Sequence, residues 1–383
     1  MSLALAIKKY PTPFYYYDME WLDRTLQSLK KAADTYDYHV HYALKANANT
    51  PILKAIQGYG FGADCVSGNE VKKAIETGFG GKKVVFAGVG KSDDEINYAL
   101  DQDIFCFNCE SVQEIQVIDE LAKKKGKIAS IALRINPNVN ANTHKYITTG
   151  LEENKFGINF WEFDEVLETL NGCDHIKLIG LHFHIGSQIK DLEPFKNLCL
   201  RVNEIQAYFI ERKIKVDHIN LGGGLGVDYE NPDEEYIVDF EKFFALFDQF
   251  LELYSGQEVH FELGRAVVAH CANLVSKVLY VKKGIKTNFA ILDAGMTELI
   301  RPALYQAYHK IDHLTPRENS SEYDYDVVGP ICESSDCFGK KIKLPEVQRG
   351  DILAIRSSGA YGEVMASQYN LRNLARVVYS TDF

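Results

Sequence analysis

The sequence predicts an α/β chain: a (β/α)8 TIM-like barrel with a second, mainly β domain built as a barrel or sandwich. Across the first two thirds of the chain, short apolar segments alternate with longer segments of helical period, which is typical of parallel strands joined by crossover helices. Eight such units occupy roughly 230 residues, a length that suits a closed barrel better than an open sheet. After Arg265 the long helical segments end and strand-like runs follow one another.

The elements are expected in the following order. The barrel strands are predicted at residues 39–45, 63–67, 84–87, 104–108, 128–136, 178–184, 218–222 and 259–263. Helices are predicted between them, including residues 111–125, 192–213 and 235–254, where apolar side chains recur at helical spacing. Strands of the β domain are predicted at residues 267–282, 289–293, 324–328 and 351–357, and residues 15–17 are expected to join their sheet. We therefore expect a barrel domain over residues 20–265 and a β domain from residues 1–19 and 266–383.

Composition excludes several classes of protein. With 42 basic and 53 acidic residues the net charge is −11, which argues against nucleic acid or an anionic membrane as the main partner. No apolar run approaches the roughly 20 residues needed to cross a bilayer, and the start of the chain lacks the features of an export signal. Eight cysteines are too few for a disulfide scaffold. Cys106 and Cys109 form a CxxC without a second such pair, which favours buried thiols over zinc. We expect a cytoplasmic protein with no metal site.

The first candidate for chemistry is Lys45, at the end of the first predicted strand. In a (β/α)8 barrel the active site forms at the carboxyl ends of the strands. Burial there would lower the pKa of the Lys45 amine and favour the neutral nucleophile of Schiff-base chemistry. From this residue alone, a lysine that extends its amine to solvent is the simpler interpretation.

Three further strand ends carry polar or glycine residues. His182 and His184 end the sixth strand, and without an evident third ligand they favour packing or stacking over metal binding. Residues 222–226 are rich in glycine, and such loops let backbone N–H groups approach an anion, although a tight turn would need glycine as well. Barrels often bind phosphate after strands seven and eight. The eighth strand ends in Glu262 and is followed by Arg265.

Together these groups suit pyridoxal 5′-phosphate (PLP). Lys45 would bind the cofactor covalently, His184 would stack on its ring and the glycine loop would hold its phosphate. Glu262 would pair with the pyridine nitrogen, which keeps the ring protonated and a strong electron sink.

Seven segments in order resemble the fold-type III PLP-dependent decarboxylases, and among these the diaminopimelate decarboxylase family: residues 42–47, 184–188, 222–226, 262–265, 301–305, 329–336 and 359–362. The resemblance implies an alanine-racemase-like fold and decarboxylation of meso-2,6-diaminopimelate to L-lysine. It also implies a homodimer with shared active sites. One departure is Leu263, where the family commonly has proline, and we expect a slightly looser turn there.

The resemblance also implies roles for individual residues. Lys45 and Cys332 would be catalytic, with Cys332 returning the proton to Cα. The implied contacts with the cofactor are Lys45, His184, Ser187, Gly222, Gly223, Gly224, Glu262, Gly264, Arg265 and Tyr361. The implied contacts with the substrate are Arg265, Arg301, Tyr305, Glu333 and Tyr361, because arginine suits the distal carboxylate and Glu333 the distal ammonium. Arg134 and Asp64 are candidates to support the cofactor from further away.

Three alternatives remain on the same fold. An ornithine, arginine or carboxynorspermidine decarboxylase is the nearest, although the ornithine enzymes resemble Cys-Asp where this chain has Cys332 and Glu333. Alanine racemases place arginine where Glu262 stands. A non-catalytic PLP-binding relative should have lost Lys45 or Cys332, and both are present.

Overall fold

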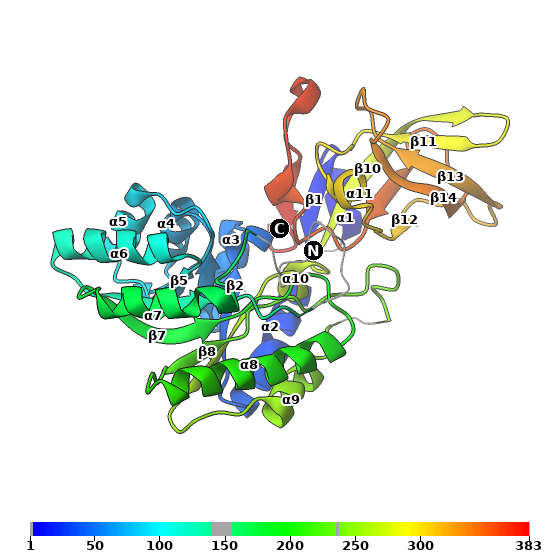
Figure 1. The fold of residues 1–383 in the computed structure, drawn as a ribbon. Helices are drawn as coiled ribbons and strands as arrows, with labels where there is room; N and C mark the ends of the chain where they lie inside the picture. The colour runs from blue at the N-terminus through cyan, green and yellow to red at the C-terminus, as the bar shows by residue number, and fades with distance from the viewer. Residues whose placement is uncertain (1–2, 140–154, 235–236, 383) are drawn as a thin grey trace. The chain divides into compact units, whose positions relative to one another are not determined.

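The computed structural model describes residues 3–139, 155–234 and 237–382 and gives two compact units. The barrel unit consists of Leu26–Gly226 and Asp239–Gly264, and the β unit consists of Met1–Thr25, Val227–Val238 and Arg265–Phe383 (Figure 1). The sequence did not indicate that Val227–Val238 belongs with the β unit. The functional division at residues 20–265 and 1–19 with 266–383 stays a prediction.

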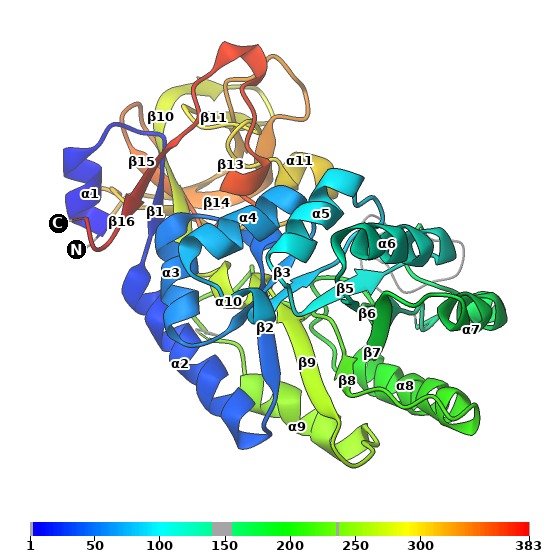
Figure 2. The ribbon, with the colours of Figure 1, turned by 90° about the vertical axis from the view of Figure 1, so that its left-hand side faces the viewer.

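The barrel unit contains a closed barrel of eight strands, which confirms the predicted fold class (Figure 2). All neighbouring strands are parallel, and the first pairs with the last through His39 opposite His260. The strands lie where the sequence predicts them, with ends that differ by up to two residues: β2 (His39–Ala43), β3 (Gly62–Cys65), β4 (Val84–Phe86), β5 (Cys106–Cys109), β6 (Ala129–Arg134), β7 (Ile176–His182), β8 (His218–Asn220) and β9 (Glu258–Leu263).

Helices surround the barrel strands in Figure 2. They are α2 (Met19–Thr35), α3 (Thr50–Gly58), α4 (Gly68–Thr77), α5 (Asp93–Asp101), α6 (Val112–Lys125), α7 (Phe163–Asn171), α8 (Glu193–Glu211) and α9 (Phe240–Phe250). Helix α6 illustrates why the helices could be predicted from the sequence. Ser111 accepts a hydrogen bond from the Glu114 amide at its start, Gly126 ends it at φ 63°, and Ile115 and Ile118 are buried.

Helix α9 is shorter than the predicted 235–254. Residues 235–236 lie outside the described part of the chain, and the helix begins after Asp239, whose side chain accepts a hydrogen bond from the Lys242 amide at 2.9 Å. The helix ends at Phe250, because Leu251 has an extended backbone. Its aromatic residues continue the barrel core, with the Phe247 ring 4.8 Å from that of Phe261 in β9.

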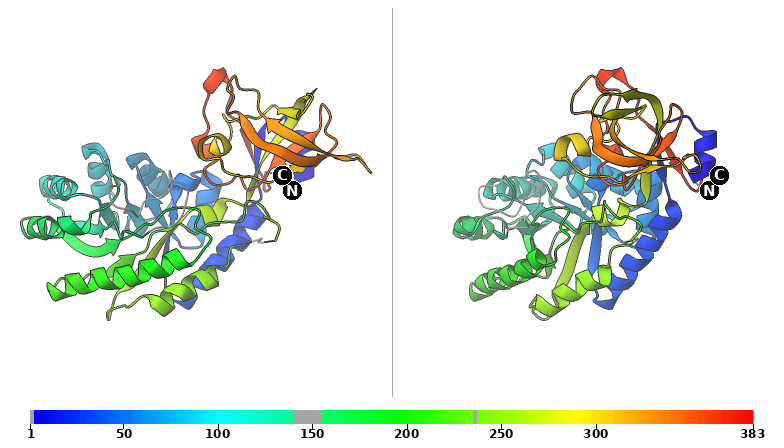
Figure 3. Two further views of the ribbon diagram at one scale, coloured as in Figure 1. Left: turned by 45° about the vertical axis from the view of Figure 1, so that its right-hand side comes forward. Right: turned by 90° about the vertical axis from the view of Figure 1, so that its right-hand side faces the viewer.

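The β unit contains an eight-stranded sheet, part of which is seen in Figure 3. As predicted, residues 15–17 join it, because Tyr15 pairs with Leu274 in the neighbouring strand. Its strands are β1 (Phe14–Tyr17), β10 (Ala272–Lys283), β11 (Asn288–Leu292), β12 (Ile311–His313), β13 (Glu322–Val328), β14 (Cys337–Pro345), β15 (Ile352–Ile355) and β16 (Arg376–Tyr379). The sheet confirms a mainly β second domain.

Two features of the β unit differ from the sequence prediction. The strand expected at 267–282 begins only at Ala272, because residues Arg265–Val268 form the short helix α10, in which the Ala269 amide donates to the Arg265 carbonyl at 2.9 Å. Strands β12, β14 and β16 were not predicted, since β12 is very short and the lysines of β14 obscure its alternation. The unit also contains helices α1 (Leu3–Lys9) and α11 (Arg301–Tyr305). In the described residues, no helix has the length and apolar character of a membrane span.

Candidate active site

Lys45 lies at the carboxyl end of β2, in the 3-10 turn Leu44–Ala46 rather than in the strand itself. Its Nζ atom is 3.4 Å from Oδ2 of Asp64, and the Lys45 side chain is partly exposed while that of Asp64 is fully buried. Burial raises the pKa of Asp64 to about 6, with repulsion from Glu262 adding to this and Lys45 opposing it. Oδ1 of Asp64 has no hydrogen-bond partner among the described residues. Asp64, expected only as a distant support, is therefore a direct neighbour of the amine.

Glu262 is the best-supported group at this end of the barrel. Its Oε2 lies 2.9 Å from Nε2 of His182, and its Oε1 accepts hydrogen bonds from the side-chain amides of Asn220 at 2.8 Å and Asn108 at 3.1 Å. Burial alone would raise the pKa of Glu262. The attraction to His182 and the hydrogen bond from His182 outweigh burial and hold the pKa of Glu262 below its ordinary value. The carboxylate is thus buried, oriented and ionised at neutral pH.

The sequence singled out Glu262 but missed its partners. Asn108 lies near the end of β5 and Asn220 is the last residue of β8, and a polar side chain at such a strand end was the signal that could have found them. His182 was considered for packing or metal binding, whereas in the structure its ring forms a hydrogen bond with the Glu262 carboxylate.

His184 lies beyond the end of β7, and its ring is held by the glycine loop. Its Nδ1 accepts a hydrogen bond from the Gly223 amide at 3.2 Å. Burial, together with repulsion from Lys45 and Arg134, lowers the pKa of His184 well below its ordinary value. The ring is therefore neutral, with its proton on Nε2, and it can offer a flat aromatic face to a cofactor.

The glycine loop after β8 needs glycine for packing. A Cβ atom on Gly223 would lie 1.9 Å from the Glu262 carbonyl oxygen, and one on Gly222 would lie 2.3 Å from the Phe183 carbonyl oxygen. The Gly222 amide already donates to Asn220 Oδ1 at 2.9 Å, as the Gly223 amide does to His184. These two amides could contact a phosphate only by giving up those bonds. The tight-turn interpretation therefore accounts for these glycines, and the phosphate role stays a prediction.

The remaining candidate residues in the barrel unit are Arg134, Gly264 and Ser187. Arg134 is paired with Glu110 at 2.7 Å, and its guanidinium lies 4.7 Å from the centroid of the Phe156 ring, so its charge is already balanced by a carboxylate. A Cβ on Gly264 would lie 3.0 Å from the Cβ atoms of Ala43 and Ala46. Ser187 is part of the loop that follows β7.

The β unit contains a second cluster, built around two buried arginines. Nη1 of Arg265 donates to the Tyr229 hydroxyl at 2.8 Å, and the guanidinium of Arg301 lies 4.5 Å from the centroid of the Tyr229 ring. Arg301 also donates to Nε2 of His309 at 2.6 Å, and Arg265 lies 4.8 Å from the centroid of the Tyr361 ring. Burial would raise the pKa of Tyr229, but the two guanidinium groups outweigh it and lower that pKa. The cluster is strongly cationic and suits an anionic group.

Within this cluster the structure brings together Arg265, Arg301 and Tyr361, as the sequence predicted. Tyr229 and His309 were missed. Tyr229 lies in Val227–Val238, the segment expected in the barrel, so no sequence signal connected it with Arg301. Tyr305 is partly buried at the end of α11, one turn after Arg301.

The Cys332 loop is also in the β unit, and its thiol is exposed, as expected for a loop. The Cys332 amide donates to Asn370 Oδ1 at 3.1 Å. Buried Asp336 fixes the same loop by accepting hydrogen bonds at 2.7 Å from the amides of Ile331 and Met296. Glu333, expected to receive an ammonium group, accepts a hydrogen bond from the Tyr369 hydroxyl at 3.0 Å. The loop thus holds an exposed thiol on a well-bonded backbone.

The barrel unit fits PLP by the chemistry of its donors. An amine, an ionised buried carboxylate and a neutral imidazole belong to the carboxyl ends of β2, β9 and β7, and Asp64 retains an unpartnered oxygen among the described residues. Cys106 and Cys109, by contrast, are buried in β5, and burial raises the pKa of both thiols. Their burial confirms the interpretation that they are structural.

Comparison with known proteins gives one consistent group. Residues 20–269 match the family model described as pyridoxal-dependent decarboxylase, pyridoxal binding domain. A diaminopimelate decarboxylase of Bacteroides thetaiotaomicron is 57% identical over 366 residues, which cover 95% of this chain and 94% of that protein. Another, from Vibrio cholerae, is 42% identical and covers 97% of this chain and 88% of its own length.

Solved structures agree with these relatives. The crystal structure of diaminopimelate decarboxylase from Helicobacter pylori complexed with L-lysine matches with a TM-score of 0.93 at 39% identity, covering 100% of this chain and 95% of that one. The lysine/ornithine decarboxylase of Vibrio vulnificus matches with a TM-score of 0.85 at 20% identity, which shows a shared fold.

Proposed function

This chain belongs to the pyridoxal-dependent decarboxylase family, and from that premise we propose that it converts meso-2,6-diaminopimelate to L-lysine and carbon dioxide, the last step of lysine biosynthesis. The observation that carries the proposal is the ionised Glu262 carboxylate, held by His182, Asn108 and Asn220 at the same end of the barrel as Lys45. A buried carboxylate held in this way can accept a hydrogen bond from a protonated pyridine nitrogen.

When bound, PLP supplies an electron sink for the electron pair left behind by carbon dioxide. Lys45 would hold the cofactor covalently and give way to the amine of the substrate. Glu262 would keep a proton on the pyridine nitrogen, and the neutral His184 ring would lie against the cofactor. Ser187, the glycine loop, Gly264, Arg265 and Tyr361 would complete its contacts.

The thiol of Cys332 would return a proton to Cα of the product, and its exposed position on a fixed loop supports this role. Arg265 and Arg301 would bind the distal carboxylate of the substrate, with Tyr305 and Tyr361 beside it, and Glu333 would bind the distal ammonium. Two buried guanidinium groups favour diaminopimelate over ornithine, which has no distal carboxylate.

Substrate specificity tests this proposal directly. The PLP-loaded protein is incubated separately with meso-diaminopimelate, ornithine and arginine, and carbon dioxide and the amine product are measured. We expect lysine from diaminopimelate and at least about 100-fold lower kcat/KM for ornithine, because unpaired buried polar groups cost about 1–3 kcal/mol each. Comparable turnover of ornithine would show that the arginine cluster does not select the substrate.

We also propose that the protein is a cytoplasmic homodimer in which Cys332 serves the partner's site. The dimer rests on the family resemblance, and the cytoplasmic location is supported by the eight cysteines, all in described segments, which form no disulfide. Inactive Lys45→Ala and Cys332→Ala proteins should regain about a quarter of wild-type sites when refolded together, since random pairing gives one intact site per heterodimer. Dimers that form but stay inactive would show that the loop works within its own chain.

A further inference from the structure

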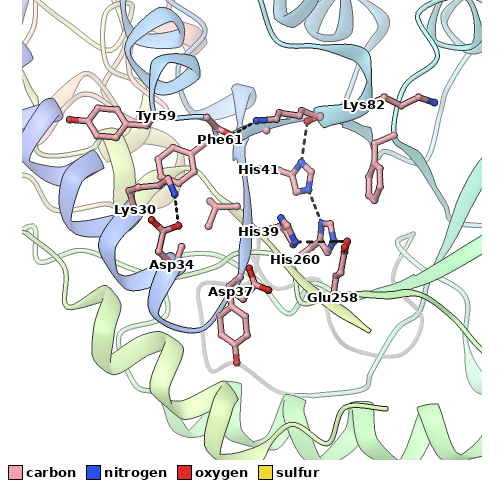
Figure 4. A pocket seen from close by; sticks show the side chains of 17 residues that line it. Lys30, Asp34, Asp37, His39, His41, Tyr59, Phe61, Lys82, Glu258 and His260 are labelled. Atoms are coloured by element: carbon pink, nitrogen blue, oxygen red, sulfur yellow. Dashed lines mark hydrogen bonds and ion pairs between the residues drawn. The ribbon is translucent and has the colours of Figure 1, made fainter. Parts of the chain in front are cut away.

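The amino-terminal end of the barrel carries a second cluster of titratable groups, which the proposed reaction does not use. His39 is the first residue of β2, and Glu258 and His260 are the first and third residues of β9 (Figure 4). The same two strands end near Lys45 and Glu262. Lys45 follows His39 by about 20 Å of extended chain, and Glu262 follows Glu258 by about 13 Å. Strands β2 and β9 are the first and last of the closed barrel. The cluster therefore lies on the seam where the barrel closes.

Three atoms that can bind a metal converge in this cluster. Oε2 of Glu258 lies 3.4 Å from Nε2 of His260 and 3.8 Å from Nε2 of His39. All three candidate ligand atoms lie within 4.8 Å of one another. A tetrahedral zinc site with bonds of about 2.05 Å has ligand–ligand edges of about 3.3 Å. His39 and Glu258 are exposed and can move the remaining distance, whereas the His260 side chain is buried.

A chain of hydrogen bonds fixes which atom of His260 faces the cluster. The Lys83 carbonyl can only accept, so Nδ1 of His41, at 3.2 Å, must donate to it. In a neutral His41 ring that donates from Nδ1, the other nitrogen, Nε2, carries the lone pair. Nδ1 of His260, 2.9 Å from that lone pair, must in turn be the donor. This leaves the lone pair of His260 on Nε2, directed to Glu258.

The ring nitrogen of His260 that faces Glu258, Nε2, is buried and has no hydrogen-bond partner among the described residues. An imidazole lone pair and a carboxylate oxygen therefore face each other at 3.4 Å. A cation between them would satisfy both.

We propose that His39, Glu258 and His260 bind a divalent transition-metal ion, with Zn²⁺ as the best match, and that this ion joins the first and last strands of the barrel. Two imidazole nitrogens and one carboxylate oxygen form a donor set that zinc commonly takes, with water in the fourth position. The carbonyl–His41–His260 chain is the kind of outer support that orients a histidine ligand.

The surroundings give an ion a route to the site. The cluster lines a cavity of about 390 Å³ at this end of the barrel. Two nearby lysines already have partners, because the Lys83 amine donates to the Gly60 carbonyl at 2.7 Å and Lys30 pairs with Asp34. Asp37 also lines the cavity without belonging to the ligand set, which makes it a matched control.

Zinc binding to the PLP-loaded, untagged full chain tests the proposal. The protein is stripped with a chelator, and Zn²⁺ is then titrated against a chromogenic competitor. We expect one tight site per chain, weakened at least tenfold in Glu258→Gln and in His39→Ala and about 10- to 100-fold in His41→Gln, which removes only the outer support. Asp37→Asn, which removes one negative charge from the same cavity, should bind as the wild type does. Absence of a tight site, or equal affinity in all four variants, would overturn the proposal.

Cobalt substitution provides a readout independent of affinity. Co²⁺ in the wild type should show the visible bands of a four-coordinate nitrogen and oxygen site, and Glu258→Gln should lose them. A thiolate charge-transfer band would assign the ion to a cysteine and contradict the proposal. Zn²⁺ should also raise the Tm of the wild type and of Asp37→Asn but not that of Glu258→Gln. None of these results depends on decarboxylation, so failure here leaves the proposed function intact.

Discussion

The two ends of strand β9 carry a glutamate in opposite states. Glu262, at the carboxyl end, is buried and receives hydrogen bonds from three side chains of other barrel strands, β5, β7 and β8. Glu258, at the amino end, is exposed and faces an imidazole nitrogen that has no hydrogen-bond partner among the described residues. The same residue type thus has its hydrogen bonds completed by protein side chains at one end and faces an unpaired ring nitrogen at the other. The side chains that other barrel strands contribute, more than the strand itself, therefore decide what a carboxylate can do.

The largest expected effect tests the carboxyl end of the barrel. Lys45→Ala should lower kcat by at least about 10³-fold, because the amine that would hold the cofactor is lost. Lys83→Gln removes a lysine at the amino end, and it should keep both bound PLP and activity. Carbon dioxide release and cofactor absorbance measure the two variants. Equal losses of kcat and of bound PLP in the two variants would contradict the assignment of the cofactor to the carboxyl end of the barrel.

The next effect separates carboxylates at the two ends. Glu262→Gln should lower kcat by about 10²-fold, since an amide cannot hold the proton on the pyridine nitrogen as a carboxylate does. Asp37→Asn removes a carboxylate from the amino-terminal cavity and should change kcat by less than about twofold. Steady-state kinetics with diaminopimelate measures both. A near-normal kcat in Glu262→Gln would show that this carboxylate does not tune the cofactor.

The smallest expected effect is on the free energy of unfolding and its dependence on pH. The pKa of Glu262 is lowered in the folded protein, so the unfolded chain binds more protons as the pH falls below the unfolded value of about 4.3. Glu262 should therefore stabilise the fold by about 2 kcal/mol at pH 7 and lose this contribution under acid. Urea unfolding should show the gap between wild type and Glu262→Gln closing below about pH 4.

The control for this measurement is again Asp37→Asn. Because Asp37 is exposed at the barrel end, its removal should change the free energy of unfolding by less than about 1 kcal/mol at each pH. A gap between wild type and Glu262→Gln that is constant from pH 7 to pH 3 would contradict the assigned direction of the Glu262 pKa shift.

Much of the fold could be predicted because its helices and strands follow from the local spacing of apolar residues. The barrel strands are short apolar runs between helical segments, and the alternation gives both their position and their parallel direction. Lys45, His184 and Glu262 were found because strand ends are the rule for active sites in such barrels. Val267 and Val268, in the short helix α10, were mistaken for the start of a strand, since these buried valines have the same local pattern as a strand.

What could not be predicted depends on how the strands are arranged around the closed barrel. Asn108 lies 154 residues before Glu262, and only the closed barrel brings their side chains to hydrogen-bonding distance. His39 and His260 are likewise joined by the pairing of the first and last strands. The sequence placed no metal site there because each residue stands at the start of a strand, outside the positions expected to carry chemistry.

The most direct test of the central claim is to locate the cofactor. The holoenzyme is reduced with borohydride, digested and mapped by mass spectrometry. We expect one pyridoxyl group per chain on the peptide that contains Lys45, beside Asp64 at the carboxyl end of the barrel. A pyridoxyl group on Lys83 or on any other lysine, with Lys45 unmodified, would contradict it.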